Sequence, residues 1–177
     1  AGYAKHWKTN EPIPAALVEK IGKSSLYGQG FATVEYTAAS YLDMNWHTLA
    51  EPKVEDATAY EKAALAKIGL IPEIVSRYRS PYFQHIFGPG GGYSAGYYSY
   101  LWSEILDADA FEAFRERGIF DKTTATAFRK NILEKGGTAE ALSLYKAFRG
   151  REPSVQPLLV RRGLAPAAAA ATAPTTH

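Results

Sequence analysis

The chain of 177 residues carries 20 lysines and arginines against 18 aspartates and glutamates, which gives a formal net charge of +2 at pH 7. The two signs are interspersed and no apolar run approaches the roughly 20 residues that span a bilayer, so we expect neither a nucleic-acid partner nor a membrane span. Cysteine is absent, which excludes disulfides, thiolate nucleophiles and cysteine metal ligands and leaves a cytoplasmic or a periplasmic location open.

Apolar residues recur at helical spacing along much of the chain, which predicts an all-α fold. The predicted helices, in chain order, cover residues 17–21, 31–47, 58–68, 123–134 and 138–148. Glycines or prolines lie in each interval between them, as expected of helix breaks. The second of these helices is long and carries large apolar residues on several turns, so we expect it to be mostly buried.

Residues 81–102, PYFQHIFGPGGGYSAGYYSYLW, are the most informative stretch. They place a histidine before a run of glycines and several tyrosines after it. Ser94 can cap a helix that begins at the next residue. If helical geometry extends back to Tyr93, then Tyr93, Tyr97 and Tyr100 follow an i, i+4, i+7 pattern and share one face. Tyr98 lies off that face.

Glycines have no side chain to block an approaching ligand, and the neighbouring imidazole and phenol groups supply hydrogen-bond donors. A substrate backbone could therefore bind here. A phenol has an ordinary pKa of about 10, stays protonated at neutral pH and can donate to a carbonyl oxygen that becomes an oxyanion. The structural alternative is a core position, which is the common role of aromatic residues at helical spacing. We assign Tyr98 to packing.

The segments His85–Gly88, Gly90–Gly92 and Tyr93–Trp102 together resemble a known signature. It is the C-terminal signature of the zinc metallopeptidases related to thimet oligopeptidase, and in particular of their bacterial peptidyl-dipeptidase, or dipeptidyl carboxypeptidase, branch. Shorter stretches that also fit this family are residues 31–36, 42–47, 148–151 and 161–164. The likeness covers roughly residues 1–164.

The resemblance implies that residues 1–164 are the C-terminal part of a helical catalytic domain, with the glycine-rich loop beside an active-site cleft. The intact enzyme would be monomeric, hydrolyse short peptides and release C-terminal dipeptides. By this likeness Tyr100 binds the oxyanion, while Tyr93 and His85 help to hold the reacting carbonyl or the adjacent substrate backbone. The implied substrate-binding residues are Tyr97, Gly91 and Gly92.

The family's zinc motif does not occur in this chain. That motif, H-E-x-x-H on a helix with a glutamate on a downstream helix, needs two histidines four residues apart. The histidines here are His6, His47, His85 and His177. We therefore expect zinc in the intact enzyme, bound by ligands outside this chain. The remaining N-terminal part of the same enzyme would be the partner, and this chain alone would be inactive. Pro89 and an extra glycine also lengthen the loop after His85 relative to the family pattern.

Two other classes of function stay open. The main alternative is a noncatalytic helical module that binds peptides or another protein through its aromatic face. The second is a domain that completes another protein's core. A phosphate-binding loop is disfavoured because no Gly-Lys-Ser/Thr follows the glycines.

The charged residues give weaker indications of function than the residues of the stretch 81–102. Solvated or capping roles are expected for several carboxylates without a fixed partner, and residues 107–109 are expected to cap a helix before Phe111. These carboxylates are Glu35, Asp43, Glu104, Asp107 and Asp109. Four arginines could bind a peptide's C-terminal carboxylate, although surface salt bridges are the default for them. They are Arg149, Arg151, Arg161 and Arg162.

The tail, residues 165–177, is rich in Ala, Pro and Thr, and we expect it to be disordered.

Overall fold

The computed structural model of this chain describes residues 3–51 and 53–166. The α-helices in this part are α1 (Ala15–Ser24), α2 (Gln29–His47), α3 (Ala57–Lys67), α4 (Ser99–Arg117), α5 (Lys122–Phe128), α6 (Ala141–Arg149) and α7 (Gln156–Arg161). The short elements are the 3-10 turns η1 (Ser80–Tyr82), η2 (Gln84–Ile86) and η3 (Pro89–Gly91), and the π-helical segment η4 (Arg129–Leu133). In the described ranges the only β-structure is an isolated antiparallel bridge between Lys5 and Pro12. The predicted all-α fold is confirmed.

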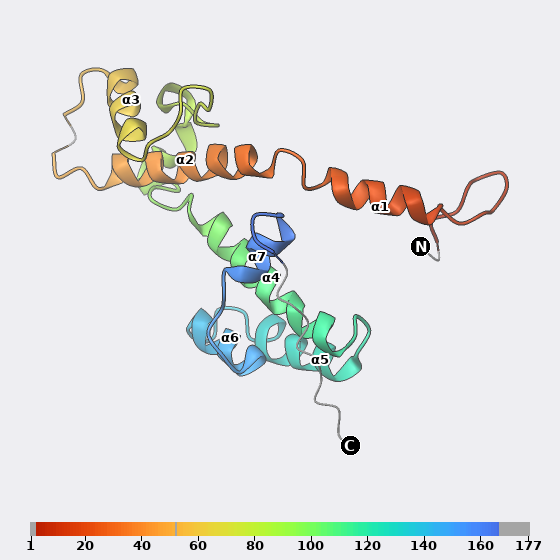
Figure 1. The fold of residues 1–177 in the computed structure, drawn as a ribbon. Helices are drawn as coiled ribbons and strands as arrows, with labels where there is room; N and C mark the ends of the chain where they lie inside the picture. Colours follow the sequence, from red (N-terminus) through yellow and green to blue (C-terminus); the bar gives the residue numbers. More distant parts are fainter. Residues whose placement is uncertain (1–2, 52, 167–177) are drawn as a thin grey trace.

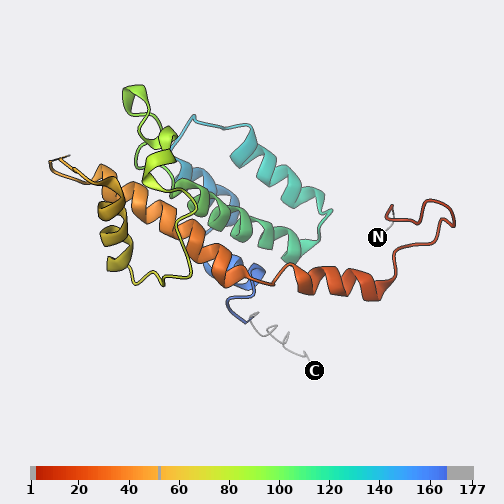
Figure 2. The same cartoon turned by 90° about the horizontal axis from the view of Figure 1, so that it is seen from above.

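The helices form two groups joined by α4. Figure 1 shows α1 and α2 following one another as a long rod, with α3 and the loop that contains the 3-10 turns gathered at the far end of α2. Helix α4 leads from that loop to the second group, where α5, α6 and α7 surround it. Viewed from above in Figure 2, α1 extends away from the other helices. None of the described helices is both long and apolar enough to cross a membrane.

The principal core lies between α2, α3 and the loop after α3. Its buried residues are Ala38, Ala39, Leu42, Ala64, Leu65, Phe83, Ile86 and Tyr97. Alanines on α2 and α3 let the two helices approach closely, and aromatic side chains from the loop close the remaining side. The indole N–H of Trp46 donates to Ser80 Oγ at 2.9 Å and ties the loop to the end of α2.

The prediction that the second helix is mostly buried was wrong for its N-terminal half. The buried residues of α2 lie between positions 38 and 43, whereas Phe31 and Val34 in its N-terminal half are about half exposed. Helical periodicity identifies an apolar face correctly but does not say what covers it. Within the described residues, the core against α3 reaches only the C-terminal half of α2.

The capping role predicted for residues 107–109 was also wrong, because these residues lie inside α4. The helix runs without a break to Arg117 and ends at Gly118, whose φ of 115° few other residues adopt. Asp109 is fully buried and accepts hydrogen bonds from Tyr145 and Arg151. A buried carboxylate is tolerated only when such donors replace its water, so Asp109 joins α4 to α6 and to the segment after it.

The two predicted C-terminal helices correspond to three elements. The first begins as α5 after Asp121, whose carboxylate caps it by accepting the Thr124 N–H at 2.7 Å, and continues through η4. The second, α6, is capped by Glu140. Most of the predicted tail, residues 167–177, lies outside the described residues.

Replacing Asp109 by asparagine should destabilise the protein. Burial raises the pKa of the Asp109 carboxyl, but hydrogen bonds from Arg151 and Tyr145 outweigh it and hold the pKa below its ordinary value. A depressed pKa contributes stability above the ordinary value of about 3.9, and that contribution disappears as the pH falls through the folded-state pKa. We expect Asp109→Asn to lower the free energy of unfolding by about 2–4 kcal/mol near neutral pH.

Urea unfolding at a series of pH values measures both effects, because the variant should also lose less stability than the wild type below about pH 4. The control is Glu19→Gln, which removes a solvent-exposed pair with Lys23 and should change stability by less than about 1 kcal/mol. Equal effects of the two substitutions would contradict a structural role for the buried carboxylate.

Candidate functional site

The loop between α3 and α4 is held in place by residues on both sides of His85. Phe83 and Ile86 are fully buried against α2, while His85 between them is exposed. The ring of Tyr78 stacks on Phe83 at 4.9 Å between centroids and meets His85 edge-on at 5.3 Å. The imidazole therefore sits at the surface on a buried aromatic base.

The glycine-rich loop folds back onto His85. The Tyr93 N–H donates to the His85 carbonyl oxygen at 3.0 Å, and Gly92 has a φ of 51°. A Cβ atom on Gly92 would lie 2.7 Å from the same carbonyl oxygen and 2.9 Å from the Gly88 nitrogen. Only glycine allows this close approach, which brings the His85 and Tyr93 rings to 6.4 Å between centroids.

Asp43, on α2, anchors the segment that follows the glycines. Its carboxylate is fully buried and accepts the Ala95 N–H and the Tyr97 N–H, each at 2.9 Å. His47, one helical turn later, places Nδ1 2.8 Å from Asp43 Oδ1. The sequence had suggested a solvated or capping carboxylate, and the structure shows a buried one that binds backbone amides.

This anchor changes where the following helix begins. The sequence predicted Ser94 as the cap of a helix starting at the next residue, but α4 starts at Ser99. Ala95 has a φ of 53°, in the left-handed region, and its amide and that of Tyr97 are directed to Asp43. The three tyrosines of the predicted face are therefore brought together by a loop and not by a continuous helix.

Four of the predicted site residues line one cavity of about 420 Å³, which we call the His85 cavity. They are His85, Tyr93, Tyr97 and Tyr100. The other two, Gly91 and Gly92, belong to the loop that brings His85 and Tyr93 together. The side chains of Tyr93 and Tyr100 are 74% and 64% exposed, so their hydroxyl groups are available to a ligand.

Tyr97 differs from the tyrosines on either side because it is buried. It is 7% exposed, and its ring lies 5.3 Å from those of Tyr36 and Phe83 and 5.6 Å from that of Tyr100. Burial, partly offset by the charge of Arg77, raises the pKa of Tyr97 to about 12. Tyr98, which we assigned to packing, is half exposed and lines the His85 cavity, so that assignment was wrong.

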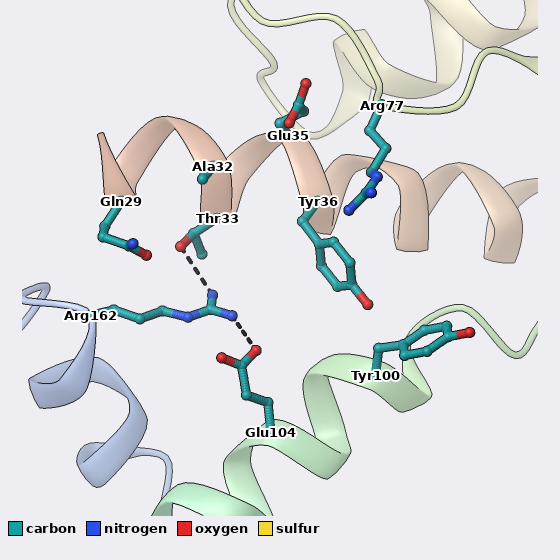
Figure 3. Close-up of a pocket in the computed structure, with 9 residues that line it drawn as sticks. All are labelled: Gln29, Ala32, Thr33, Glu35, Tyr36, Arg77, Tyr100, Glu104 and Arg162. Carbon is teal, nitrogen blue, oxygen red and sulfur yellow. Dashed lines mark hydrogen bonds and ion pairs between the residues drawn. The ribbon is translucent and has the colours of Figure 1, made fainter. Parts of the chain in front are cut away.

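A second cavity of about 430 Å³, the Arg77 cavity, lies between α2, α4 and α7 (Figure 3). Tyr100 lines both cavities. On its far side, Arg162 donates to Thr33 Oγ1 at 3.0 Å and to the carboxylate of Glu104. Burial raises the pKa of Tyr36, whose ring meets that of Tyr100 edge-on at 6.5 Å.

Sequence reasoning missed two residues that line the Arg77 cavity, Tyr36 and Arg77, and the anchoring role of Asp43. Asp43 lies 52 and 54 residues before the amides that it binds, and Arg77 lies in a stretch without helical periodicity. No local pattern could have identified them. The only signal was the likeness to the peptidase family of residues 31–36, which include Tyr36, and of residues 42–47, which include Asp43.

The four arginines considered as carboxylate ligands all have acidic partners. Arg149 pairs with Glu116 at 3.1 Å and Arg151 with Asp109 at 2.5 Å. The remaining two pair with carboxylates of α4 through Arg161–Asp107, Arg161–Glu104 and Arg162–Glu104. The expected salt bridges are present for all four arginines, but the Arg149 side chain is only 7% exposed and Asp109 is fully buried, so these two pairs are not surface pairs.

No group of three or more His, Asp or Glu side chains in the described ranges is arranged to hold a metal ion. His85 and His47 stand in different environments, the first at the His85 cavity and the second against Asp43. The residues that the structure describes therefore do not form a complete zinc site.

Two comparisons with known proteins, one with family patterns and one with individual sequences, agree on the same peptidase family. The pattern described as "Peptidase family M3" matches residues 1–164. The dipeptidyl carboxypeptidases of Salmonella typhimurium and Escherichia coli are 43% and 39% identical over 92% and 93% of this chain. Oligopeptidase A of Escherichia coli is 37% identical over 90% of the chain. The chain spans about a quarter of the length of these relatives, 24% for the first two and 23% for the third.

Replacing Asp43 by asparagine should release the backbone after the glycine-rich loop. An amide has a single acceptor oxygen, so one of the two N–H groups loses its partner and faces an NH₂ group. A hydrogen bond to a charged group contributes roughly 1.5–3 kcal/mol, which corresponds to about a tenfold to hundredfold rise in local opening. Hydrogen exchange of the Ala95 and Tyr97 amides measures this rise.

The matched control is Asp56→Asn. Asp56 also accepts two backbone N–H groups, from Thr58 and Ala59, but at the start of α3. Its substitution should accelerate exchange there and leave residues 95–97 unchanged. Unaltered protection of residues 95–97 in Asp43→Asn would show that Asp43 does not hold the loop.

Proposed function

The chain belongs to peptidase family M3, and we propose that it supplies the substrate-binding and oxyanion-stabilising part of a zinc metallopeptidase that hydrolyses short peptides and releases C-terminal dipeptides. The observation that carries this proposal is the convergence of His85 and the two exposed tyrosines, Tyr93 and Tyr100, on one cavity. Two relatives of this chain are named dipeptidyl carboxypeptidase, which supports the proposed release of C-terminal dipeptides.

Tyr100 carries the main chemical role in this proposal. When water adds to a peptide carbonyl, the carbonyl oxygen becomes negatively charged, and a phenol proton directed at it stabilises that charge more in the transition state than in the substrate. Tyr93 and His85 hold the same carbonyl or the neighbouring substrate backbone. His85 and Tyr100 rest on the buried rings of Phe83 and Tyr97, so the positions of these two side chains are set before substrate binds. The Tyr93 ring meets that of His85 edge-on.

The remaining predicted residues have supporting roles. Tyr97 contacts substrate from the floor of the His85 cavity, whose lining it joins despite its burial. Gly91 and Gly92 leave the loop without side chains, which allows a substrate backbone to approach. A zinc ion bound by polypeptide outside this chain would polarise the scissile carbonyl and activate the attacking water.

The proposed partner is the remaining part of the same enzyme, and the exposed surface supports this. The accessible surface is 12880 Å² for a mass of 19.4 kDa, whereas a compact monomer of that mass exposes about 8,500 Å². Helix α1 has no buried residue, and Leu17, Val18 and Ile21 are about half exposed. We propose that these faces are covered in the intact, monomeric enzyme.

Tyr100→Phe in the full-length enzyme should reduce kcat by about 10²–10³, because one oxyanion donor is lost. KM should change little, since the hydrogen bond strengthens only as charge develops. Steady-state hydrolysis of a short peptide measures both constants. The control is Tyr41→Phe, which removes the hydroxyl group of a half-exposed tyrosine of α2. It should leave kcat and KM unchanged. An unaltered kcat in Tyr100→Phe would favour a role limited to peptide binding.

Ile21→Ser in the full-length protein tests whether α1 is covered. If the rest of the enzyme packs on this helix, loss of the buried side chain should lower the free energy of unfolding by about 2–3 kcal/mol. If Ile21 remains 60% exposed, as in this chain, the change should stay within about 0.5 kcal/mol. Lys20→Ser, on the neighbouring position of the same helix, is the control in chemical denaturation.

A further inference from the structure

His47, in the last turn of α2, contacts both ends of the glycine-rich loop. Its ring lies 5.4 Å from that of Phe87, measured between centroids, at an angle of 35°. Phe87 directly precedes Gly88, where the loop begins. At the other end of the loop, the Ala95 nitrogen lies 3.4 Å from His47 Nδ1 and donates its hydrogen to Asp43. One imidazole therefore spans the base of the loop.

The contacts of His47 Nδ1 indicate that this nitrogen carries a hydrogen. Two oxygen atoms of Asp43 lie close to it, Oδ1 at 2.8 Å and the backbone carbonyl oxygen at 2.9 Å. Oxygen acceptors on both sides require a donor between them. The Ala95 N–H then has no acceptor at Nδ1, and its partner is Asp43 Oδ1 at 2.9 Å, the shorter of its two contacts. The imidazole N–H therefore completes the set of donors that stabilises the buried Asp43 carboxylate.

His47 lies behind the residues that a substrate can reach. Of the residues that the structure describes, it is not among those that line the His85 cavity or the Arg77 cavity, and its side chain is only 20% exposed. The residues that it contacts are nevertheless close in the chain to the cavity. His85 lies two residues before Phe87. Tyr93 lies two residues before Ala95. Any effect of His47 on a substrate is therefore indirect and passes through the loop.

We propose that His47 is a positioning residue that fixes His85 relative to Tyr93 by holding both ends of the glycine-rich loop. This inference rests on the proposed peptidase function, in which these two side chains hold the reacting carbonyl or the adjacent substrate backbone. The hydrogen bond from the Tyr93 N–H to the His85 carbonyl oxygen closes the loop on itself, whereas His47 attaches both ends to α2. Glycines allow many backbone conformations, so such an attachment is needed to keep one geometry. A displacement of about 1 Å at a reacting group can reduce a rate by about 10²-fold.

His47→Ala in the full-length enzyme should lower kcat for a short peptide by about tenfold to a hundredfold, because the groups that hold the carbonyl lose their fixed separation. KM should change by less than about threefold, since no group that contacts substrate is removed. Rates are measured at a temperature at which both proteins are folded, so that a role limited to stability would leave kcat unchanged. His47→Asn places an amide N–H near the position of Nδ1 and should recover part of kcat. His47→Gln places it farther from Asp43 and should recover less.

Hydrogen exchange of the full-length protein tests the same contacts independently of catalysis. The Phe87 N–H donates to the Gln84 carbonyl oxygen, so its exchange reports on the first end of the loop, and the Ala95 N–H reports on the second. His47→Ala should accelerate exchange at Ala95 by about tenfold, because a hydrogen bond to the anchoring carboxylate is lost. At Phe87 the loss of an aromatic contact should accelerate exchange by about threefold to tenfold. Asp43→Asn should affect only the second end.

The matched control is His6→Ala, which removes an exposed histidine whose Nδ1 accepts the Thr9 N–H. It should leave kcat and both exchange rates unchanged. The role of His47 is overturned if His47→Ala keeps the wild-type kcat, or if exchange accelerates at only one end of the loop or at neither. A wild type that cleaves no peptide would refute the proposed peptidase function, while the exchange rates would still decide whether His47 holds both ends of the loop.

Discussion

The arrangement of the candidate site depends on the contact between the Asp43 carboxylate and two backbone amides of the loop. Asp43 is fully buried on α2, where a charge is stable only if hydrogen-bond donors replace water. The Ala95 and Tyr97 amides and His47 surround it. Because this contact fixes the chain between the glycines and α4, it sets the positions of the tyrosines on either side of Ala95 relative to the core.

Buried and exposed aromatic residues have different tasks around this anchor. The rings of Phe83, Tyr78 and Tyr97 contact one another and form a rigid base, because displacing any of them would open a void in a close-packed core. Tyr93 and Tyr100 project from that base to solvent. Such an arrangement suits groups that must meet a developing charge in a fixed geometry, since little reorganisation is needed when substrate arrives.

The chain combines the His85 cavity with a large uncovered surface. Its accessible area is about half again that expected of a compact protein of its mass, and the described residues contain no set of metal ligands. The same arrangement that leaves Tyr100 and Arg77 accessible to solvent leaves α1 and the first half of α2 without a covering layer. Both features agree with a family member that spans about a quarter of its relatives' length.

The sequence by itself determined the helical class, the approximate extent of most helices and the cluster of His85, Tyr93, Tyr97 and Tyr100, because periodicity and neighbouring residues in one loop are local properties. It misplaced the start of α4 and the role of residues 107–109, and it did not identify Arg77. Only the tertiary structure decided these points. The amides bound by Asp43 are 52 and 54 residues away, and the Tyr145 hydroxyl bound by Asp109 is 36 residues away. Whether a charged side chain is paired, buried or free depends on such distant partners, which no local pattern contains.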